Sequence, residues 1–370
     1  MTKLCAISVL SCENAEMPEA SCSFASDNFA GAHPDVIAAL AAANVGHAIA
    51  YGDDPISLDV YSRFEELFGM GTKTFFVFAG TGGNVTALSS LAGPGDAVVC
   101  TQWSHIHVDE TAAPERAGLK LLPFASVDGK LSVDDLDSAA NWLGSQHHAQ
   151  PRIVSLTQPT EMGTLYSIEE VRALCRRAHE LGMVVHMDGA RIANATAALG
   201  GLDALRSFTV DAGVDVLTFG GTKNGLVFGE AVLYFPQSGN PVVERAVAYA
   251  PWARKQTTQL PSKARFVAAQ FAAVLTDELW VDLGRRSNAA ARTLYDSVSG
   301  IAALALTEPP AVNSLYPVVP ESLAAELRKV SFFWPWDPAT DRVRWMTSWD
   351  TTEDDISTFS GAVHKLFVSN

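Results

Sequence analysis

The sequence predicts an α/β protein that has a mainly parallel β-sheet and a smaller second domain. Between residues 23 and 235, apolar strand-like runs alternate with amphipathic helix-like runs. This alternation is typical of a parallel sheet with helices packed on both faces. The strand-like runs are apolar at nearly every position, as parallel strands are when both of their faces are buried.

Five strands are expected in the first part of the chain, at residues 74–78, 97–100, 153–156, 183–187 and 214–219. Residues 168–181 predict a helix, because apolar residues recur there at helical spacing. Gly182 follows, and glycine is common just after the end of a helix. After Pro261 the pattern becomes helical and then mixed and proline-rich, with one more strand expected at 342–346.

Three segments are expected along the 370 residues, a length that gives room for two or three domains. Residues 1–22 mix serine, cysteine, glutamate and proline without a period, which indicates a flexible arm. Residues 23–260 are expected to form the large domain, and residues 261–370 a smaller α+β domain.

The charge balance argues against several classes of partner. There are 26 basic and 41 acidic side chains, which give a formal net charge of −15. Such a chain does not attract nucleic acid or an anionic membrane surface. No stretch reaches the roughly 18–20 apolar residues of a membrane span. A small-molecule partner is therefore expected.

The cysteines indicate a reducing compartment. The five cysteines are an odd set and have no CxxC spacing, so we expect reduced thiols in a cytoplasmic protein. The apolar run at residues 4–10 is at the lower edge of a signal-peptide core, and we expect no export.

Polar residues that directly follow the expected strands are the candidates for function, because ligands of open α/β sheets bind beyond the carboxyl ends of the strands. The first such segment is GTGGN at residues 80–84, before a helix expected to begin near Val85. Backbone amides, the Thr81 hydroxyl and a helix N-terminus together can cradle a phosphate. The segment matches neither the dinucleotide nor the Walker pattern, and a plain turn is the alternative.

The second and third segments supply an acid and an amine. Asp188 follows the strand 183–187, where it can bind magnesium, pair with a protonated ring nitrogen, or act as a structural cap. Lys223 lies among small residues after the strand 214–219. A partly desolvated lysine has a lowered pKa and can form a Schiff base with an aldehyde, although an exposed loop lysine is the alternative.

The fourth segment contains two histidines after the strand 97–100. If the backbone stays extended there, His105 and His107 face the same side and could share a metal ion with Asp109, as in metal-dependent hydrolases. No further histidine-rich ligand set is evident, so we expect no metal and a His105 imidazole that stacks on a ring. A phosphate cradle, a stacking imidazole, a ring-pairing acid and a Schiff-base lysine are together what pyridoxal 5′-phosphate needs.

At this point the sequence resembles the threonine aldolase and β-eliminating lyase family of fold type I pyridoxal-phosphate enzymes, in particular its low-specificity L-threonine aldolases. The resemblance runs from Ser23 to near the C-terminus. It rests on four motifs, which are FASDN at 24–28, YGDDP at 51–55, HMDGARIAN at 186–194 and TKNG at 222–225. The resemblance implies the pyridoxal-phosphate-dependent transferase-like fold and the corresponding cofactor.

Roles at the cofactor are implied residue by residue. Lys223 matches the lysine that binds the cofactor aldehyde, and Asp188 matches the partner of the pyridine nitrogen. Gly80 and Thr81 match the phosphate loop, with Lys263 or Arg254 as a further phosphate contact. His105 matches the stacked imidazole, and Arg191 resembles an arginine beside the cofactor.

The resemblance also implies the substrate and the assembly. Ser26 and Arg344 match groups that hold the substrate carboxylate, a task that suits the planar fork of guanidinium. Tyr51 matches a substrate-site loop near a neighbouring subunit, which implies a homodimer or homotetramer with shared active sites. Part of the family has a histidine after the strand 153–156, where this chain has Glu161. Glu161 is either the base for the substrate hydroxyl or a hydrogen-bonding loop residue.

The expected reaction is the cleavage of L-threonine, L-allo-threonine or a related L-β-hydroxy-α-amino acid such as phenylserine to glycine and an aldehyde, with Lys223, His105 and Glu161 as catalytic residues. Three alternatives remain open. The same fold could catalyse β-elimination or racemisation, His105 and His107 could serve a metal-dependent hydrolase, or the protein could bind the cofactor without turnover.

Overall fold

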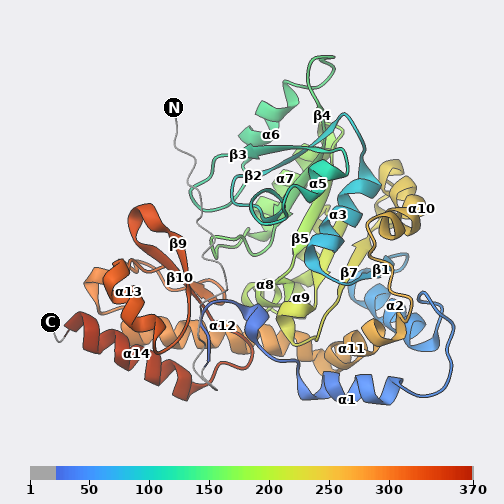
Figure 1. Cartoon of the computed structure of the whole chain (residues 1–370). Coiled ribbons are helices and arrows are strands. Elements are labelled where there is room, and N and C mark those ends of the chain that lie inside the picture. The colour runs from blue at the N-terminus through green and yellow to red at the C-terminus, as the bar shows by residue number, and fades with distance from the viewer. Residues whose placement is uncertain (1–21, 369–370) are drawn as a thin grey trace. The chain divides into compact units, whose positions relative to one another are not determined.

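A computed structural model describes residues 22–368 and divides them into two compact units (Figure 1). The larger unit is Gly31–Arg285, and the smaller unit contains residues 22–30 and 286–368. The arm expected at 1–22, the apolar run at 4–10 and two of the five cysteines therefore lie wholly or almost wholly outside the described residues. None of the helices between residues 22 and 368 is long and apolar enough to cross a membrane.

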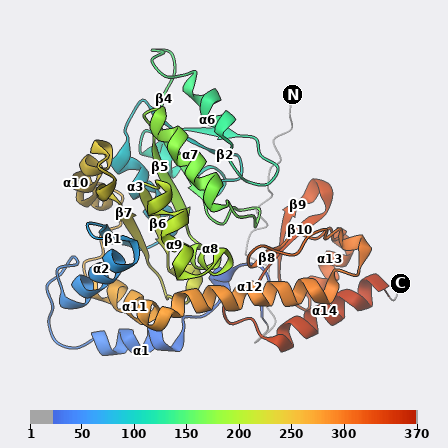
Figure 2. The ribbon, with the colours of Figure 1, turned by 180° about the vertical axis from the view of Figure 1, so that it is seen from behind.

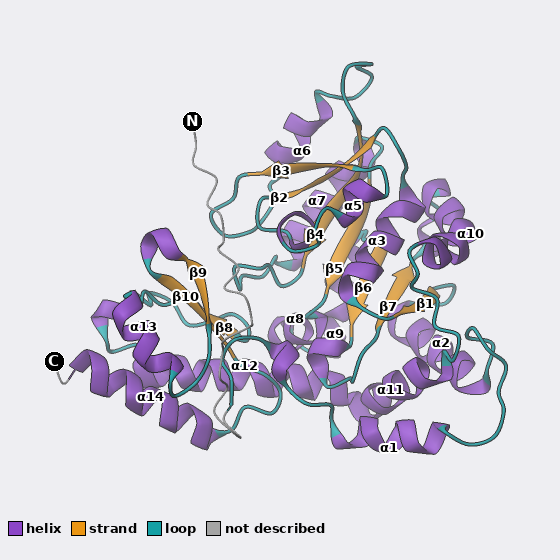
Figure 3. Ribbon diagram, in the orientation of Figure 1, coloured by secondary structure: helices purple, strands orange, loops and turns teal. Residues whose placement is uncertain are grey.

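The larger unit is built on a seven-stranded sheet with the order β1-β7-β6-β5-β4-β2-β3 (Figure 3). The pairs that join β3, β2, β4, β5 and β6 are parallel, whereas β7 runs antiparallel to both β6 and β1. The strands are β1 Lys73–Val77, β2 Asp96–Thr101, β3 Lys120–Phe124, β4 Gln150–Thr157, β5 Val184–Gly189, β6 Val216–Gly220 and β7 Glu230–Tyr234. The mainly parallel sheet and the five expected strands are confirmed.

Helices cover both faces of this sheet. Alternate strand residues point to opposite faces, so Val154 and Val185 join a core with α7 and α8, while Ile153 and Val184 join a core with α3 and α10. Figure 2 shows α7 and α8 in front of the sheet. The helices of the larger unit are α1 Pro34–Ala43, α2 Pro55–Phe68, α3 Gly80–Leu91, α4 His105–Val108, α5 Ala113–Arg116, α6 Val133–Ala140, α7 Ile168–Glu180, α8 Ile192–Leu199, α9 Leu202–Leu205, α10 Pro241–Gln256 and α11 Arg265–Leu275.

Helix α7 confirms the helix expected at 168–181. Its N-terminus is closed by a capping box, in which the Ser167 hydroxyl accepts from the Glu170 amide and the Glu170 carboxylate accepts from the Ser167 amide. Such reciprocal bonds satisfy two amides that the helix itself cannot. Gly182 follows with φ +74, a conformation that favours glycine.

Helix α3 begins earlier than expected. The prediction placed its start near Val85, but the helix runs from Gly80 and includes the whole GTGGN segment. The prediction was wrong because it took the glycines as loop residues, whereas two of them are needed for close packing. A Cβ added to Gly82 would collide with the amide of Gln259, and one added to Gly83 would lie 2.8 Å from Thr218 Cγ2.

The smaller unit is an α+β structure. Its three-stranded antiparallel sheet has the order β8-β10-β9, and the strand expected at 342–346 is confirmed as β10. The aromatic side chains of Phe24, Phe333, Trp345 and Phe359 pack in its core. Its elements are β8 Ser314–Leu315, β9 Trp334–Asp337, β10 Arg342–Met346, α13 Glu321–Arg328 and α14 Glu353–Val368.

The boundary between the compact units lies within α12 (Leu279–Val298), between Arg285 and Arg286. The sequence placed its domain boundary after residue 260, which assigns α11 to the second domain. In the structure Val267 and Phe271 of α11 pack in the core of the larger unit with Phe76 and Phe64.

Candidate active site

Asp188 is the centre of a buried polar cluster in the larger unit. It lies at the carboxyl end of β5, where it pairs with Thr157 of β4 and Thr218 of β6, and is only 3% exposed. Its Oδ1 accepts from the amide of Ala190 at 2.9 Å, and its Oδ2 accepts from Nδ2 of Asn84 at 2.8 Å. Burial alone would raise the pKa of Asp188, but the charges of His105 and His186 and these hydrogen bonds lower it below its ordinary value.

Glu110 extends the cluster from Asp188 to His105. Oε1 of Glu110 accepts from Nδ2 of Asn84 at 2.8 Å and lies 2.8 Å from Nδ1 of His105. The Glu110 side chain is fully buried, whereas that of His105 is 27% exposed. Sequence reasoning missed Glu110, because it follows no strand directly and belongs to no motif that was recognised.

The charges of three expected site residues, Asp188, Glu161 and Lys223, change the pKa of His105. Burial lowers the pKa of His105, but the hydrogen bond to Glu110 and the negative charges of Asp188 and Glu161 raise it more, while Lys223 opposes them. The net effect is a pKa above the ordinary value of histidine. Asp188, Glu161 and Lys223 are thus electrostatic neighbours of one imidazole.

His105 and His107 do not face the same side, so the geometry expected for a metal shared between them is wrong. Both residues lie in the single turn of α4, so they do not face the same side as alternate residues of a strand would. Among residues 22–368, no three or more histidine, cysteine, aspartate or glutamate side chains are grouped so that they could hold a metal ion.

Lys223 lies in the tight loop between β6 and β7, in the turn Thr222–Asn224. It is half-buried, and its amine makes no hydrogen bond or ion pair with any described residue. The loop is held by Glu230, whose carboxylate accepts from the Gly221 amide, while the Thr222 hydroxyl accepts from the Gly229 amide at 3.1 Å. Burial raises the pKa of Glu230 to about 7, although hydrogen bonds with Gly221 and Thr222 and the charge of Lys223 oppose the rise.

Glu161 and Arg191 form an ion pair near the same cluster. Oε2 of Glu161 lies 3.8 Å from Nη1 of Arg191, and their side chains are 11% and 8% exposed. Arg191 therefore has a carboxylate neighbour inside the site, and Glu161 is held close to the guanidinium.

The N-terminus of α3 is open in the way that a phosphate would need. Ala79, at the N-cap, provides no side-chain hydrogen bond, and nothing lies within 4 Å of a Cβ built on Gly80. The first amides of a helix have no partner inside it, and they carry the positive end of the helix dipole. Arg254 is 7% exposed, its Nη1 donates to the carbonyl of Phe76 at 3.2 Å, and its Nε has no partner among the described residues.

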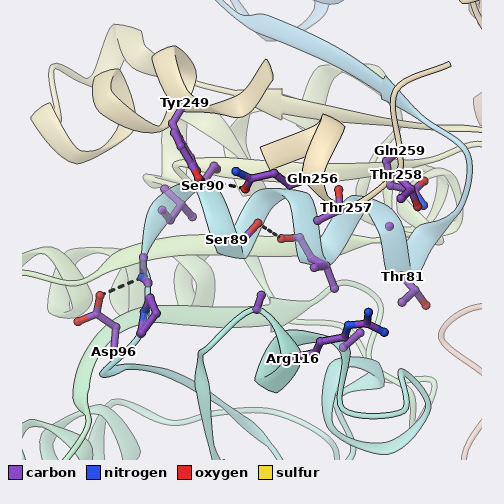
Figure 4. Close-up of a pocket in the computed structure, with 18 of the residues that line it drawn as sticks. Thr81, Ser89, Ser90, Asp96, Arg116, Tyr249, Gln256, Thr257, Thr258 and Gln259 are labelled. Carbon is purple, nitrogen blue, oxygen red and sulfur yellow. Dashed lines mark hydrogen bonds between the residues drawn. The ribbon is translucent and has the colours of Figure 1, made fainter. Parts of the chain in front are cut away.

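A cavity of about 980 Å³ continues from this helix N-terminus along α3 (Figure 4). Thr81 and Gln259 lie at one end of it, and Asp96 lies at the other. Helices α5 and α10 contribute Arg116 and Tyr249. Asp188, His105 and Lys223 do not line it, so the cavity adjoins the N-terminus of α3 and is separate from the polar cluster.

Lys263 and Tyr51 lie on neighbouring loops of the larger unit. The Tyr51 amide donates to the carbonyl of Ser262 at 3.0 Å, and the Tyr51 ring lies 6.0 Å from Nζ of Lys255. Tyr51 is 50% exposed and Lys263 is exposed as well. No hydrogen bond or ion pair of the described residues joins either side chain to the Asp188 cluster.

Ser26 and Arg344 lie together in the smaller unit. Ser26 caps the short turn Asp27–Phe29, and Nη2 of Arg344 donates to the carbonyl of Ala25, the residue before Ser26, at 3.2 Å. The guanidinium also lies 5.2 Å from the ring of Trp336. Nε of Arg344 is buried without a partner among the described residues, which leaves a donor for an anion.

Comparison with known proteins gives consistent matches over most of the chain. Residues 23–321 match the model of the family described as beta-eliminating lyase. A low specificity L-threonine aldolase of Pseudomonas aeruginosa is 39% identical over 330 residues, which are 89% of this chain and 93% of the relative. Another of Pseudomonas sp. (strain NCIMB 10558) is 37% identical over 339 residues, 91% of this chain and 95% of the relative. A threonine aldolase structure from Leishmania major superposes with a TM-score of 0.86 at 29% identity, covering 94% of this chain and 99% of that chain.

Proposed function

Because the chain belongs to the beta-eliminating lyase family, we propose that it is an aldehyde-lyase that uses pyridoxal 5′-phosphate to cleave L-threonine and related L-β-hydroxy-α-amino acids to glycine and an aldehyde. The names of the Pseudomonas relatives and of the Leishmania structure support this activity. The chain has the fold of type I pyridoxal-phosphate enzymes, which supports the cofactor.

The donor set of the larger unit fits this cofactor. The uncapped N-terminus of α3 at Gly80 and Thr81 would hold the phosphate, and the unpartnered Nε of Arg254 indicates an anion nearby. His105 would stack on the ring, and the half-buried amine of Lys223, which has no partner among the described residues, would bind the aldehyde covalently. Arg191 would lie beside the ring, and Lys263 would be a further phosphate contact.

Asp188 would hold a proton on the pyridine nitrogen. Its lowered pKa keeps it an anion at neutral pH, and its burial strengthens its attraction for a ring cation. The bound cofactor supplies the electron sink for cleavage of the Cα–Cβ bond. The chain's own contribution is to keep that sink charged and fixed in place.

The substrate would be held by its carboxylate. Arg344 has a buried Nε donor to offer, and the adjacent Ser26 would supply a hydroxyl. Tyr51 would line the substrate site of a neighbouring subunit. Such clamps fix the Cα–Cβ bond in the orientation that cleavage requires.

A base must take the proton of the substrate β-hydroxyl, and His105 and Glu161 are the candidates. Both lie in the electrostatic neighbourhood of Asp188 and Lys223. They differ in what holds them, since Glu161 pairs with Arg191 and His105 pairs with Glu110.

The observation that carries the proposal is that hydrogen bonds join Asp188 to His105 through Asn84 and Glu110, with Lys223 among the charges that act on His105. The substitution Lys223→Ala is expected to remove the visible band of the bound cofactor and almost all glycine release from L-threonine, because no other described amine lies in the cluster. Absorbance spectra and glycine assays measure both. Lys120→Ala, at the exposed first position of β3, is the control and should change neither. A Lys223→Ala protein with the spectrum and rate of the wild type would overturn the assignment.

The substrate range can be measured by aldehyde formation with L-threonine, L-allo-threonine and phenylserine. We expect glycine as the common product. Pyruvate from L-serine, or a racemised substrate, would instead indicate β-elimination or racemisation by the same fold.

A homodimer or homotetramer in the cytoplasm is also proposed. The described cysteines Cys22, Cys100 and Cys175 are free thiols, which agrees with a reducing compartment.

A further inference from the structure

A chain of short hydrogen bonds joins His105 to Asp188 through two residues that have no assigned role. Glu110 Oε1 contacts Nδ1 of His105 and accepts from Asn84, and the same Asn84 amide nitrogen donates to Oδ2 of Asp188. All three contacts are 2.8 Å long. The four side chains come from α3, α4, the loop after α4, and β5.

Glu110 is a costly residue for a purely structural link. Its side chain is fully buried, and Oε2 has no hydrogen-bond partner among the described residues. Burial raises the pKa of Glu110, although His105 and Asn84 oppose the rise. A buried carboxylate that is not fully satisfied costs more than a neutral amide of the same shape. A glutamine at position 110 could contact both Asn84 and His105 at a lower desolvation cost. We therefore expect the negative charge of Glu110 to have a function.

The bridge determines which nitrogen of His105 carries a proton. An ionised carboxylate only accepts hydrogen bonds, so Nδ1 of His105 must be the donor in its contact with Glu110. Nε2 is then the nitrogen that can accept a proton. Nε2 makes no hydrogen bond to a described residue, and the ring is partly exposed. Glu161, the other candidate base, is instead held at 3.8 Å from the guanidinium of Arg191.

We propose that Glu110 is a positioning residue, which together with Asn84 holds His105 with Nδ1 protonated and Nε2 free to take the proton of the substrate hydroxyl. This inference rests on the proposed aldol cleavage. In the proton transfer the O–H bond breaks, an N–H bond forms at Nε2, and the oxygen keeps the electron pair. The imidazole becomes an imidazolium, whose charge Glu110 balances in the same way as the carboxylate of a catalytic triad balances its histidine.

The first test is the pH dependence of kcat/KM for L-threonine in Glu110→Gln. The groups that act on His105 are Asp188, Glu161, Lys223 and Glu110, and only Glu110 is changed. Loss of its negative charge is expected to lower the pKa of His105, so the acidic limb of the profile moves to lower pH. The plateau is expected to fall roughly 10- to 1,000-fold, because proton transfer by a positioned side chain contributes about 10²- to 10⁴-fold.

The second test asks whether Glu110 acts through His105. His105→Phe keeps an aromatic ring but removes both nitrogens. If Glu110 acts only through the imidazole, Glu110→Gln has no further effect on kcat in the His105→Phe background, so the two losses are non-additive. Additive losses would show a merely structural Glu110 and would overturn the proposal. Glu115→Gln, at an exposed position of α5, is the matched control and should leave the profile unchanged.

The third test does not depend on turnover. Nitrogen-15 NMR of the histidines, in the holoenzyme and in the cofactor-depleted full chain, reports which nitrogen of His105 is protonated, with His105→Phe giving the assignment. We expect Nδ1–H in the wild type and a lower pKa of His105 in Glu110→Gln. A wild-type Nε2–H tautomer would overturn the proposal even if aldolase activity is present. If the wild type has the expected tautomer but releases no glycine, the proposed function fails and the positioning stands. If Glu110→Gln does not fold, Glu110→Asp, which retracts the charge, is expected to shift the pKa in the same direction.

Discussion

Glu230, which holds the loop of Lys223, makes the stability of the protein depend on pH. Its folded pKa of about 7 lies above its ordinary value of 4.5, so the folded state binds more protons than the unfolded state between these values. The sign follows from linkage: the contribution of Glu230 to the free energy of unfolding is fully present below pH 4.5 and is lost as the pH rises through 7. The structure thus tolerates a buried acid next to Lys223 at a cost in stability.

Glu230→Gln is therefore expected to stabilise the protein at alkaline pH. The amide keeps an acceptor for the Gly221 amide but has no charge to bury. We expect the free energy of unfolding at pH 8.5 to rise on the order of 2 kcal/mol, with a smaller gain at pH 6, as measured by urea unfolding followed by tryptophan fluorescence. Glu66→Gln, on the exposed face of α2, should change stability at neither pH. Equal gains at both pH values would contradict the linkage.

Individual residues of the candidate site were predictable when they follow a strand. Lys223, Asp188 and His105 could be proposed because polar residues after apolar strands stand out in the sequence. Glu110, Asn84 and Glu230 could not be assigned roles, because their importance comes from contacts across the fold. Asn84 and Asp188 are 104 positions apart in the sequence, and no local pattern records that contact.

At the scale of elements, the apolar runs predicted the central strands well because those strands are buried on both faces. Strands β3 and β7 were missed, since Pro123 interrupts one and the acidic Glu230 begins the other. The start of α3 was misplaced because glycine in the first turn was taken as a sign of a loop. In α3, Gly82 and Gly83 allow close packing against the side chains of Gln259 and Thr218.

Gly83→Ala tests this explanation of α3. Alanine has the better helix propensity, but its Cβ would meet the buried Thr218 side chain of β6 at 2.8 Å. Overpacking of this kind costs about 1–3 kcal/mol, so we expect a lower melting temperature. Gly93→Ala, where nothing lies within 4 Å of the added Cβ, serves as the comparison and should change stability by less than about 0.5 kcal/mol. A Gly83→Ala protein more stable than the wild type would refute the packing argument.

At the scale of the whole molecule, exposed aromatic residues of the larger unit bear on the proposed oligomer. Phe78 and Phe228 form one pair with ring centroids 6.2 Å apart, and Tyr249 and Trp252 form another at 6.0 Å. Both pairs are tied to residues 256–259, since Gln259 accepts from the Phe78 amide and Gln256 accepts from the Tyr249 hydroxyl. Aromatic side chains are enriched where protein surfaces associate.

Trp252→Glu is expected to weaken the oligomer. It replaces an aromatic side chain that is 61% exposed in the single chain with a charged one. Analytical ultracentrifugation should then show a smaller species, and L-threonine cleavage should fall if Tyr51 serves a neighbouring subunit. Val127→Glu is the control, since Val127 is 95% exposed and lies outside these aromatic pairs. An unchanged sedimentation coefficient for Trp252→Glu would exclude this surface as an interface.

The smaller unit is assembled from both ends of the chain. The amide of Met346 donates to the carbonyl of Phe24, and Arg344 reaches the carbonyl of Ala25 across 319 positions of sequence. During synthesis on the ribosome, Phe24 and Ala25 therefore cannot form these hydrogen bonds until nearly the whole polypeptide has been made. A truncated nascent chain could complete the sheet of the larger unit but would lack Arg344 beside Ser26, the two residues that we propose to bind the substrate carboxylate.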